Sequence, residues 1–289
     1  MEYILHILVI CGIYSILALS LNLILGYTGL VNLGHVAFYA TGAYISALLT
    51  LQAGLSPWIG LLAGGLGAAL IGIVVTLPAL RLKSDYLALA TLGAGIIVYQ
   101  VSKNWTSLTR GPMGLPGIPG FSIFGIAFDS TWSYLILVIV FVLITLFIIN
   151  RLVTGAYGRV LKSIREDEVA SSVLGKNVNK YKFQVFITGA FFAGLAGSLY
   201  AHYITFIDPS SFTIMESMTI ILMVIFGGMA SIKGSVAGAV ILVVIPEMLR
   251  FLGMPSSIAA PLRQMIYGLL LVILMMKRPQ GLFGKFRFT

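Results

Sequence analysis

Long apolar stretches, separated by short polar connections, make up almost the whole chain. A helix needs about 20 consecutive apolar residues to cross the hydrocarbon core of a bilayer. The chain is 59% hydrophobic and 9% charged, whereas a soluble domain averages about 25% charged residues. Side chains of this composition could not cover a water-facing surface. The sequence therefore predicts an all-α integral membrane protein.

The apolar stretches predict a polytopic bundle of about nine membrane-spanning helices, within a range of about eight to ten. We expect them to form a single transmembrane domain over residues 1–289. Several stretches are short, so one or two helices are expected to be tilted, broken or re-entrant. The predicted spans are Tyr3–Leu25, Gly34–Leu51, Pro57–Leu80, Ser84–Val101, Trp132–Asn150, Phe183–Phe206, Phe212–Ala230, Gly234–Leu249 and Ile258–Met276.

Two Gly-rich stretches, Gly26–Tyr44 and Gly227–Val243, both place a weakly polar turn before a helix of small residues. Interrupted segments in corresponding positions are typical of the central pathway of transporters, so we expect an internal repeat with broken helices. Small residues also recur at four-residue spacing at Gly189, Ala193 and Gly197. Such rows predict close packing of helices in lipid.

Four polar residues surround the first Gly-rich break, and they are Asn22, Thr28, Asn32 and His35. Polar groups within a membrane are costly, which makes them functional candidates. These side chains are predicted either to line a translocation path or to hydrogen-bond the unwound backbone of the break. We expect His35 to be a hydrogen-bonded structural residue rather than a ligand or a proton carrier.

Lys and Arg are enriched in the cytoplasmic connections of membrane proteins, which sets the expected orientation. With the N-terminus outside and the C-terminus in the cytoplasm, the inner connections carry 14 Lys and Arg against four Asp and Glu. The longest outer connection, residues 102–131, contains the Gly- and Pro-rich stretch Gly111–Gly120, which is either a solvent loop or a docking surface. Glu216 and Glu247 are expected near outer helix ends, which leaves no carboxylate near the middle of the membrane.

One polar interruption, Arg151–Lys182, holds 10 of the 27 charged residues. Elsewhere the charges lie between apolar runs and form no basic face, so no binding of nucleic acid is predicted. Within the interruption, Ser163 and Glu166 fit a capping box that starts a helix, and Gly175 is placed to end it. A helix of about ten residues is unstable alone in water. It must therefore pack against another surface.

The predicted short helix has an apolar face, which comprises Val169, Val173 and Leu174. Lipid headgroups are one candidate surface for this face. Against them, the three consecutive acidic residues Glu166–Glu168 would be repelled by an anionic leaflet. The other candidate is a groove on a cytoplasmic protein, which the sequence favours.

No residues for catalysis or nucleotide binding are recognisable in the chain. There is no G-x-x-x-x-G-K-[ST] phosphate loop, since the nearest fragment, Leu174–Asn177, lacks the preceding glycine and the Ser or Thr. The three histidines and the single cysteine lack metal-ligand spacing. We expect a protein that is not an enzyme and that binds no metal or cofactor itself. Energy from ATP would have to enter through a partner chain.

Four stretches together resemble one family, and they are Leu21–Tyr44, Gly158–Ala201, Phe226–Ala239 and Ile266–Gly284. Spread over nearly the whole chain in the expected order, they resemble the LivM-type permease subunits of bacterial high-affinity branched-chain amino acid ABC importers. The resemblance implies a translocation path for branched-chain amino acids across the bacterial inner membrane. It also implies four kinds of partner: a second, related permease in a pseudo-twofold heterodimer, two ATPase subunits that bind ATP and Mg, a periplasmic binding protein, and the lipid bilayer.

The resemblance identifies Arg151–Lys182 as a cytoplasmic segment that couples the permease to an ATPase. The coupling residues that it implies are Arg159, Ser163, Ile164, Arg165, Glu166, Glu168, Val169, Leu174 and Gly175. Two alternatives stay open: the same architecture carrying urea or short amides, and a secondary transporter or channel without ATPases. The latter would need carboxylates near the middle of the membrane, which the sequence does not indicate.

Overall fold

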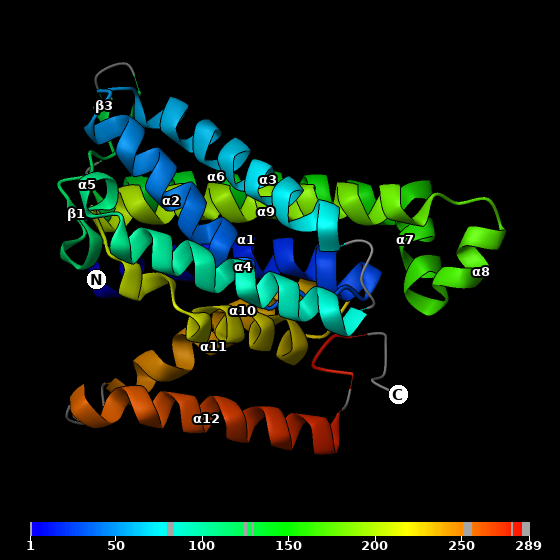
Figure 1. Cartoon of the computed structure of the whole chain (residues 1–289). Coiled ribbons are helices and arrows are strands. Elements are labelled where there is room, and N and C mark those ends of the chain that lie inside the picture. The colour runs from blue at the N-terminus through cyan, green and yellow to red at the C-terminus, as the bar shows by residue number, and fades with distance from the viewer. Residues whose placement is uncertain are drawn as a thin grey trace.

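The computed structural model describes residues 2–79, 84–123, 126–128, 130–250, 256–278 and 280–284 as a bundle of long helices (Figure 1). The α-helices are α1 (Glu2–Leu21), α2 (His35–Leu51), α3 (Pro57–Ala79), α4 (Ser84–Asn104), α5 (Thr106–Thr109), α6 (Thr131–Thr154), α7 (Ala156–Glu166), α8 (Glu168–Val173), α9 (Val178–Ile204), α10 (Ile214–Gly227), α11 (Ile232–Arg250) and α12 (Ser256–Lys277). The π-helical turn η1 (Asn22–Gly26) continues α1, and η2 (Gly111–Met113) and η3 (Pro209–Phe212) are 3₁₀ turns. The strands are β1 (Leu115–Pro116), β2 (Ser122–Ile123), β3 (Ile126–Ala127) and β4 (Phe206–Ile207).

Each of the nine predicted apolar stretches coincides with a helix of the bundle. In the described part of the chain, five helices are long and apolar enough to cross a membrane by themselves: α1 continued by η1, α3, α4, α6 and α9. The apolar helices α2 and α10 are shorter, with 17 and 14 residues, because a Gly-rich break bounds each of them. The chain is thus a multi-pass helical membrane protein, while the count of about nine spans stays a prediction.

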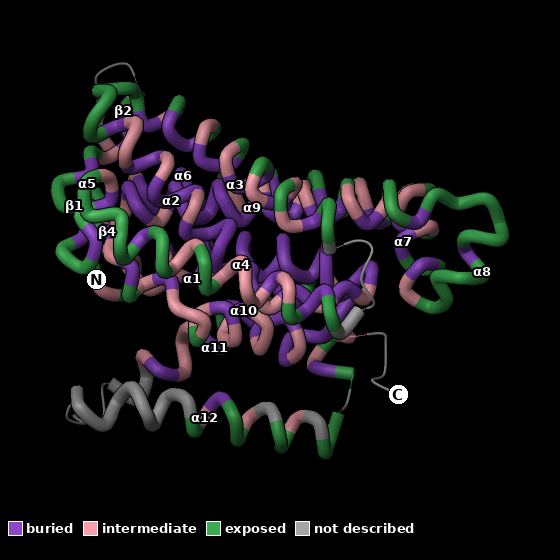
Figure 2. Tube along the Cα trace, viewed as in Figure 1, coloured by how far each residue is buried: buried purple, intermediate pink, exposed green. Residues whose placement is uncertain are grey.

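The outward surface of α3 is a continuous apolar stripe. Its exposed side chains are Ile59, Leu62, Leu66, Leu70 and Val74, each more than half exposed. Figure 2 shows buried residues along the middle of the bundle and exposed residues gathered in the end loops and around α8. A stripe of this length would be unfavourable in water but is expected where a helix faces lipid tails.

Helices α2, α3 and α9 approach each other closely because glycines lie between them. A Cβ atom added to Gly42 of α2 would lie 2.1 Å from the Gly194 carbonyl oxygen of α9. One added to Gly197 would lie 2.0 Å from the Tyr39 carbonyl oxygen. On the same row of α9, a Cβ on Gly189 would lie 2.5 Å from a methyl group of Ile24. The small-residue row is therefore a packing surface, as predicted.

Residues 105–123 fold with residues 206–212 into a packed structure, here called the cap. β1 pairs with β4 in antiparallel register, and Phe121 is fully buried between the rings of Trp58 and His202. Trp58 Nε1 donates a hydrogen bond to the Ser122 carbonyl at 2.8 Å, and His202 Nδ1 lies 2.6 Å from the Pro119 carbonyl oxygen. These contacts correct the prediction of a plain solvent loop, whereas a docking role stays a prediction.

The bundle has two distinct ends (Figure 1). The start of α1 and the cap lie at one end, which we call the cap end. Helices α7 and α8 and the last turn of α12 lie at the other, which we call the coupling end. The first and last described helical residues, Glu2 and Lys277, are thus at opposite ends of the bundle.

Candidate functional site

The polar interruption forms two short helices that project from the coupling end (Figure 1). Helix α7 turns Leu161 and Ile164 inward, where they are 0% and 3% exposed. Helix α8 buries only Ser171. Of the predicted coupling residues, Arg159 and Glu166 are exposed and Arg165 is partly buried. Helix α7 is therefore anchored on the bundle, and α8 is presented outward by it.

The start of α8 differs from the predicted capping box. Ser163 and Glu166 both lie inside α7. The cap is Asp167, whose Oδ1 accepts a hydrogen bond from the backbone N–H three residues later at 2.9 Å. Because α7 already starts at Ala156, Ser163 has helical backbone and cannot be a cap. Its hydroxyl instead bonds that of Ser171 at 2.7 Å, so the prediction of one helix starting at Ser163 was wrong.

The end of α8 is the one predicted. Gly175 has a φ of 76°, in the left-handed region. The backbone N–H groups of Gly175 and Lys176 donate to the carbonyls of Ser172 and Ser171, at 3.0 and 3.2 Å. This pair of bonds is a Schellman motif, in which glycine is favoured because it has no Cβ atom. The role of Gly175 in ending the helix is confirmed.

The apolar side chains of α8 and of Leu174, the residue after it, point away from the bundle. Val169, Val173 and Leu174 are 72%, 81% and 76% exposed, and we call these three residues the docking face. An ion pair of 2.5 Å between Glu168 and Lys182 fixes α8 against the start of α9. Exposed apolar groups held in place by a rigid support are typical of a surface that meets another protein.

Arg165 connects α7 to the first Gly-rich break. Its guanidinium donates a hydrogen bond to the carbonyl oxygen of Gly26, the last residue of η1. Its Cγ atom would lie 3.3 Å from a Cβ atom on Gly29, which has a positive φ of 72°. Burial lowers the pKa of Arg165, and Glu166 acts against this shift. An arginine stays protonated in such a site, so the bond to Gly26 is charge-assisted.

Asn22 joins the first break to the second one. Its Oδ1 atom accepts a hydrogen bond from Ala230 N at 2.9 Å, and its Nδ2 atom donates to the Ser231 carbonyl at 3.1 Å. Asn22 is 1% exposed. A Cβ atom on Gly26 would lie 2.6 Å from Ala230 N, so the two Gly-rich breaks touch. One side-chain amide therefore holds the ends of α1 and α10 together.

Replacing Asn22 with alanine is expected to lower the free energy of unfolding by about 2–4 kcal/mol, because a buried N–H and a buried carbonyl lose their partners. Thermal unfolding of the purified chain in detergent would show this as a lower Tm. The control is Asn150→Ala, an exposed residue of α6, for which a change within about 0.5 kcal/mol is expected. Equal shifts for the two variants would contradict the role of Asn22.

The other three predicted path residues bond within the first break. His35 Nε2 lies 2.8 Å from Ser20 Oγ, and His35 Nδ1 lies 3.2 Å from Asn32 Nδ2. Asn32 Oδ1 also accepts from the backbone N–H two residues later at 3.1 Å. Thr28 donates to the carbonyl four residues earlier at 2.5 Å. The structure thus brings Asn32 and His35 together, with both nitrogens of the imidazole in contact, and confirms His35 as a hydrogen-bonded residue.

Two hydroxyl groups from other helices complete the hydrogen bonding of the first break. Leu33 N donates to Thr91 of α4 at 3.1 Å, and Ser217 of α10 donates to the Leu33 carbonyl at 2.6 Å. Sequence reasoning missed Thr91 and Ser217, because a lone hydroxyl residue in an apolar helix carries no local pattern that reveals its partner.

The second break is held by the segment after α12. Leu282 N and Phe283 N donate to the carbonyls of Phe226 and Gly227, at 3.0 and 2.9 Å. Gly228, with a φ of 108°, packs so closely here that an added Cβ atom would lie 2.2 Å from Gly284 N. The end of α10 is therefore bonded both to Asn22 and to the C-terminal segment.

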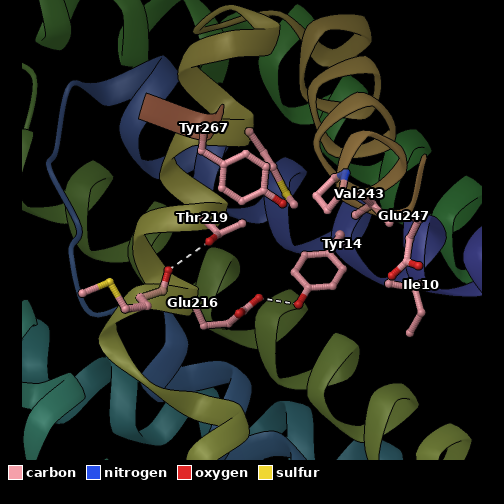
Figure 3. A pocket seen from close by; sticks show the side chains of 10 residues that line it. Ile10, Tyr14, Glu216, Thr219, Val243, Glu247 and Tyr267 are labelled. Carbon is pink, nitrogen blue, oxygen red and sulfur yellow. Dashed lines mark hydrogen bonds between the residues drawn. The ribbon is translucent and has the colours of Figure 1, made fainter. Parts of the chain in front are cut away.

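The acidic residues of α10 and α11 lie at different depths. Glu216 accepts a hydrogen bond from the hydroxyl of Tyr14, the middle residue of the apolar span Glu2–Gly26. Glu247 accepts one from Tyr3, in the first turn of α1. Both residues lie near helix ends, as expected, since Glu216 is in the first turn of α10, and its place outside the membrane stays a prediction. The start of α10 thus lies beside Tyr14 of α1 (Figure 3), whereas Glu247 of α11 lies beside the first turn of α1.

Residues 3–275 match the family described as branched-chain amino acid transport system / permease component. The high-affinity branched-chain amino acid transport system permease protein LivM of Escherichia coli K12 is 39% identical, over 93% of this chain and 67% of its own length. A probable branched-chain amino acid transport permease protein LivM of Methanocaldococcus jannaschii is 27% identical, over 94% of this chain and 90% of its own length. The high-affinity branched-chain amino acid transport system permease protein LivH of Salmonella typhimurium is 25% identical, over 94% of this chain and 91% of its own length. The chain belongs to the family of branched-chain amino acid transport system permease components.

Proposed function

We propose that this chain is the membrane-spanning permease subunit of an ABC importer for branched-chain amino acids. The printed names of the LivM relatives support the cargo. The observation that carries the coupling role is the continuous connection from the exposed docking face, through α7 and Arg165, to the Gly26 carbonyl. ATP and Mg would bind to partner ATPases, which push on Val169, Val173 and Leu174.

A second permease of the same family would complete the path. LivH of Salmonella typhimurium matches 94% of this chain, which supports a pair of related subunits about a pseudo-twofold axis. In this assembly the coupling end faces the cytoplasm, in agreement with the excess of Lys and Arg in residues 151–182 and in the C-terminal tail. The N-terminus and the cap then face outward, where a binding protein would deliver the substrate.

Closure of the ATPases would move α8 and, with it, α7. Because Arg165 holds the Gly26 carbonyl, this motion pulls on η1. Because Asn22 bonds the backbone of Ala230 and Ser231, the second break moves together with the first. Two states of this linked pair of breaks would open the path alternately to the two sides.

The cargo is tested with the complete importer in proteoliposomes. We expect ATP-dependent uptake of labelled leucine, isoleucine and valine, and no uptake of urea. The control omits the ATPase subunits, and uptake should then cease. Uptake of urea without leucine would support the amide alternative, and uptake driven by an ion gradient without ATPases would support a secondary transporter; either result would overturn the proposal.

A further inference from the structure

A groove of about 360 Å³ lies between α4, the first Gly-rich break and the start of α10. Helix α4 runs beside α2 and α10 in the bundle (Figure 1). Gly95, which lines the groove, is the middle residue of the apolar span Tyr86–Asn104. Ile96 and Gln100, two further lining residues, are exposed, so the groove opens at the outward surface of α4.

The wall of the groove is aliphatic, with no charged side chain among its described lining residues. Small-molecule sites enclose the apolar part of a ligand in such a wall and orient the ligand with a few polar groups. The apolar side chains of this wall are Leu33, Val36, Leu92, Ile96 and Ile214.

The polar groups of the groove are neutral. They include the amide of Gln100 and the hydroxyl of Thr213, and both groups can donate and accept hydrogen bonds. Such groups can bond the ammonium or the carboxylate of an amino acid without attracting one sign of charge. The lining therefore suits a branched hydrocarbon group joined to a zwitterion of no net charge.

The outward surface of α4 is unsuited to lipid tails. Of the five candidate spans in the described part of the chain, α4 is the least buried and also has the lowest mean hydropathy. Its outward residues include Gln100, whereas α3 presents large aliphatic side chains. Polar groups within a membrane are costly unless they face protein or a water-filled path. The groove is therefore expected to open toward such a path.

The groove is bonded to the first break on two sides. Leu33, one of its lining residues, receives a hydrogen bond at its carbonyl from Ser217 of α10 and donates one from its N–H to Thr91 of α4. A shift of the break would therefore move one wall of the groove relative to the others. The width of the groove would then differ between the two states of the linked breaks.

We propose that this groove binds the branched hydrocarbon side chain of the amino acid while it crosses the membrane. Gln100 and Thr213 orient its polar groups, and the break at Leu33 opens and closes the groove. This inference rests on the proposed function, and it adds to it a site that distinguishes side chains by their size.

The first test compares leucine with valine, whose side chain is one methylene smaller. Gly95→Ala adds a methyl group whose carbon would lie 3.4 Å from the Gly34 Cα atom and 4.0 Å from a methyl group of Val36. These are ordinary contacts, so the variant is expected to fold. With saturating, loaded binding protein, the ratio of leucine to valine uptake by the complete importer in proteoliposomes should fall about fivefold, because the larger side chain is excluded.

The matched control is Gly93→Ala, the same change two residues away on α4. Gly93 does not line the groove, and a Cβ atom there would meet no described atom within 4 Å. Its ratio of leucine to valine uptake should equal that of the unmodified protein. An unchanged ratio for Gly95→Ala, or an equal fall for both variants, would overturn this inference alone. Failure of the unmodified importer to move leucine would overturn the proposed function.

The second test measures access to the groove, and it holds even if Gly95→Ala fails to assemble. In complexes that carry Cys11→Ser, one cysteine is placed in the groove as Ile96→Cys or on the outward stripe of α3 as Leu66→Cys. The two native side chains are 46% and 59% exposed. The reagent is 2-sulfonatoethyl methanethiosulfonate, which is charged and reacts in water but does not enter lipid tails.

We expect the reagent to label Ile96→Cys and not Leu66→Cys in proteoliposomes. Labelling of Ile96→Cys should slow at least threefold during turnover with leucine-loaded binding protein, compared with ATP and unloaded binding protein. No labelling at Ile96→Cys would mean that lipid or a partner chain covers the groove. Labelling that leucine does not slow would mean that the substrate passes elsewhere. Either result would overturn the proposal.

Discussion

Replacing Arg165 with alanine is expected to abolish ATP-driven uptake, with a rate loss of about 100-fold. The guanidinium is the group of α7 that bonds the Gly26 carbonyl, so without it the motion of α7 no longer acts on η1. The ATPase subunits should still bind, because Val169, Val173 and Leu174 are untouched. ATP hydrolysis should therefore continue without transport. The measurement is the ratio of leucine molecules imported to ATP molecules hydrolysed in proteoliposomes.

The control for this variant is Lys162→Ala, which removes an exposed positive charge from the same helix. Its ratio of import to hydrolysis should equal that of the unmodified protein. If Arg165→Ala imports leucine at the normal ratio, the bond to Gly26 does not transmit force. If Arg165→Ala loses the ATPases as well, Arg165 acts in docking instead.

Replacing Leu174 with aspartate is expected to detach the ATPase subunits. Leu174 is 76% exposed and would be buried in a groove of the partner, where an unpaired charge is strongly unfavourable. We expect the affinity for the ATPases to fall about 100-fold or more. Co-purification from detergent and a titration of the ATPase against the immobilised permease both measure this loss. The bundle itself should keep its Tm, because Leu174 packs outside it.

Ser172→Asp provides the matched control. Ser172 is exposed on α8 and does not belong to the docking face, so the same charge is added two residues away on a polar position. Near-normal binding is expected for it. Equal losses for the two variants would indicate a general effect of negative charge on α8, and normal binding by Leu174→Asp would contradict docking through these apolar groups.

The coupling segment shows what local sequence can and cannot predict. Gly175 and the apolar positions around it were predictable, because a left-handed glycine and a short apolar face depend on adjacent residues alone. The residue that caps α8 was not predictable, since the sequence offers two candidates close together. Ser163 and Asp167 are both favourable caps, and the earlier start of α7 at Ala156 decides between them. The contact between Arg165 and Gly26 joins residues 139 positions apart and has no local signal.

The broken helices were predictable only in part. Their Gly-rich composition indicated two interruptions, but only the structure shows that they touch through Asn22. The contact between Glu216 and Tyr14 was not predictable, because it joins residues 202 positions apart. In the structure, residues 206–207 first pair with β1 in the cap, and α10 starts only at Ile214.

The glycine contacts among α2, α3 and α9 have a mechanical consequence. At Gly42 and Gly197 the backbone of one helix meets that of the next, so no intervening side chain can change rotamer and let the helices slide. These three helices respond to force as one solid body, fixed further by the cap. Force that enters at α8 reaches this body through the ion pair between Glu168 and Lys182 of α9, and it reaches the end of α1 through the bond from Arg165 to Gly26. We therefore expect force from α8 to follow two routes, one into the body of α2, α3 and α9 and one into α1.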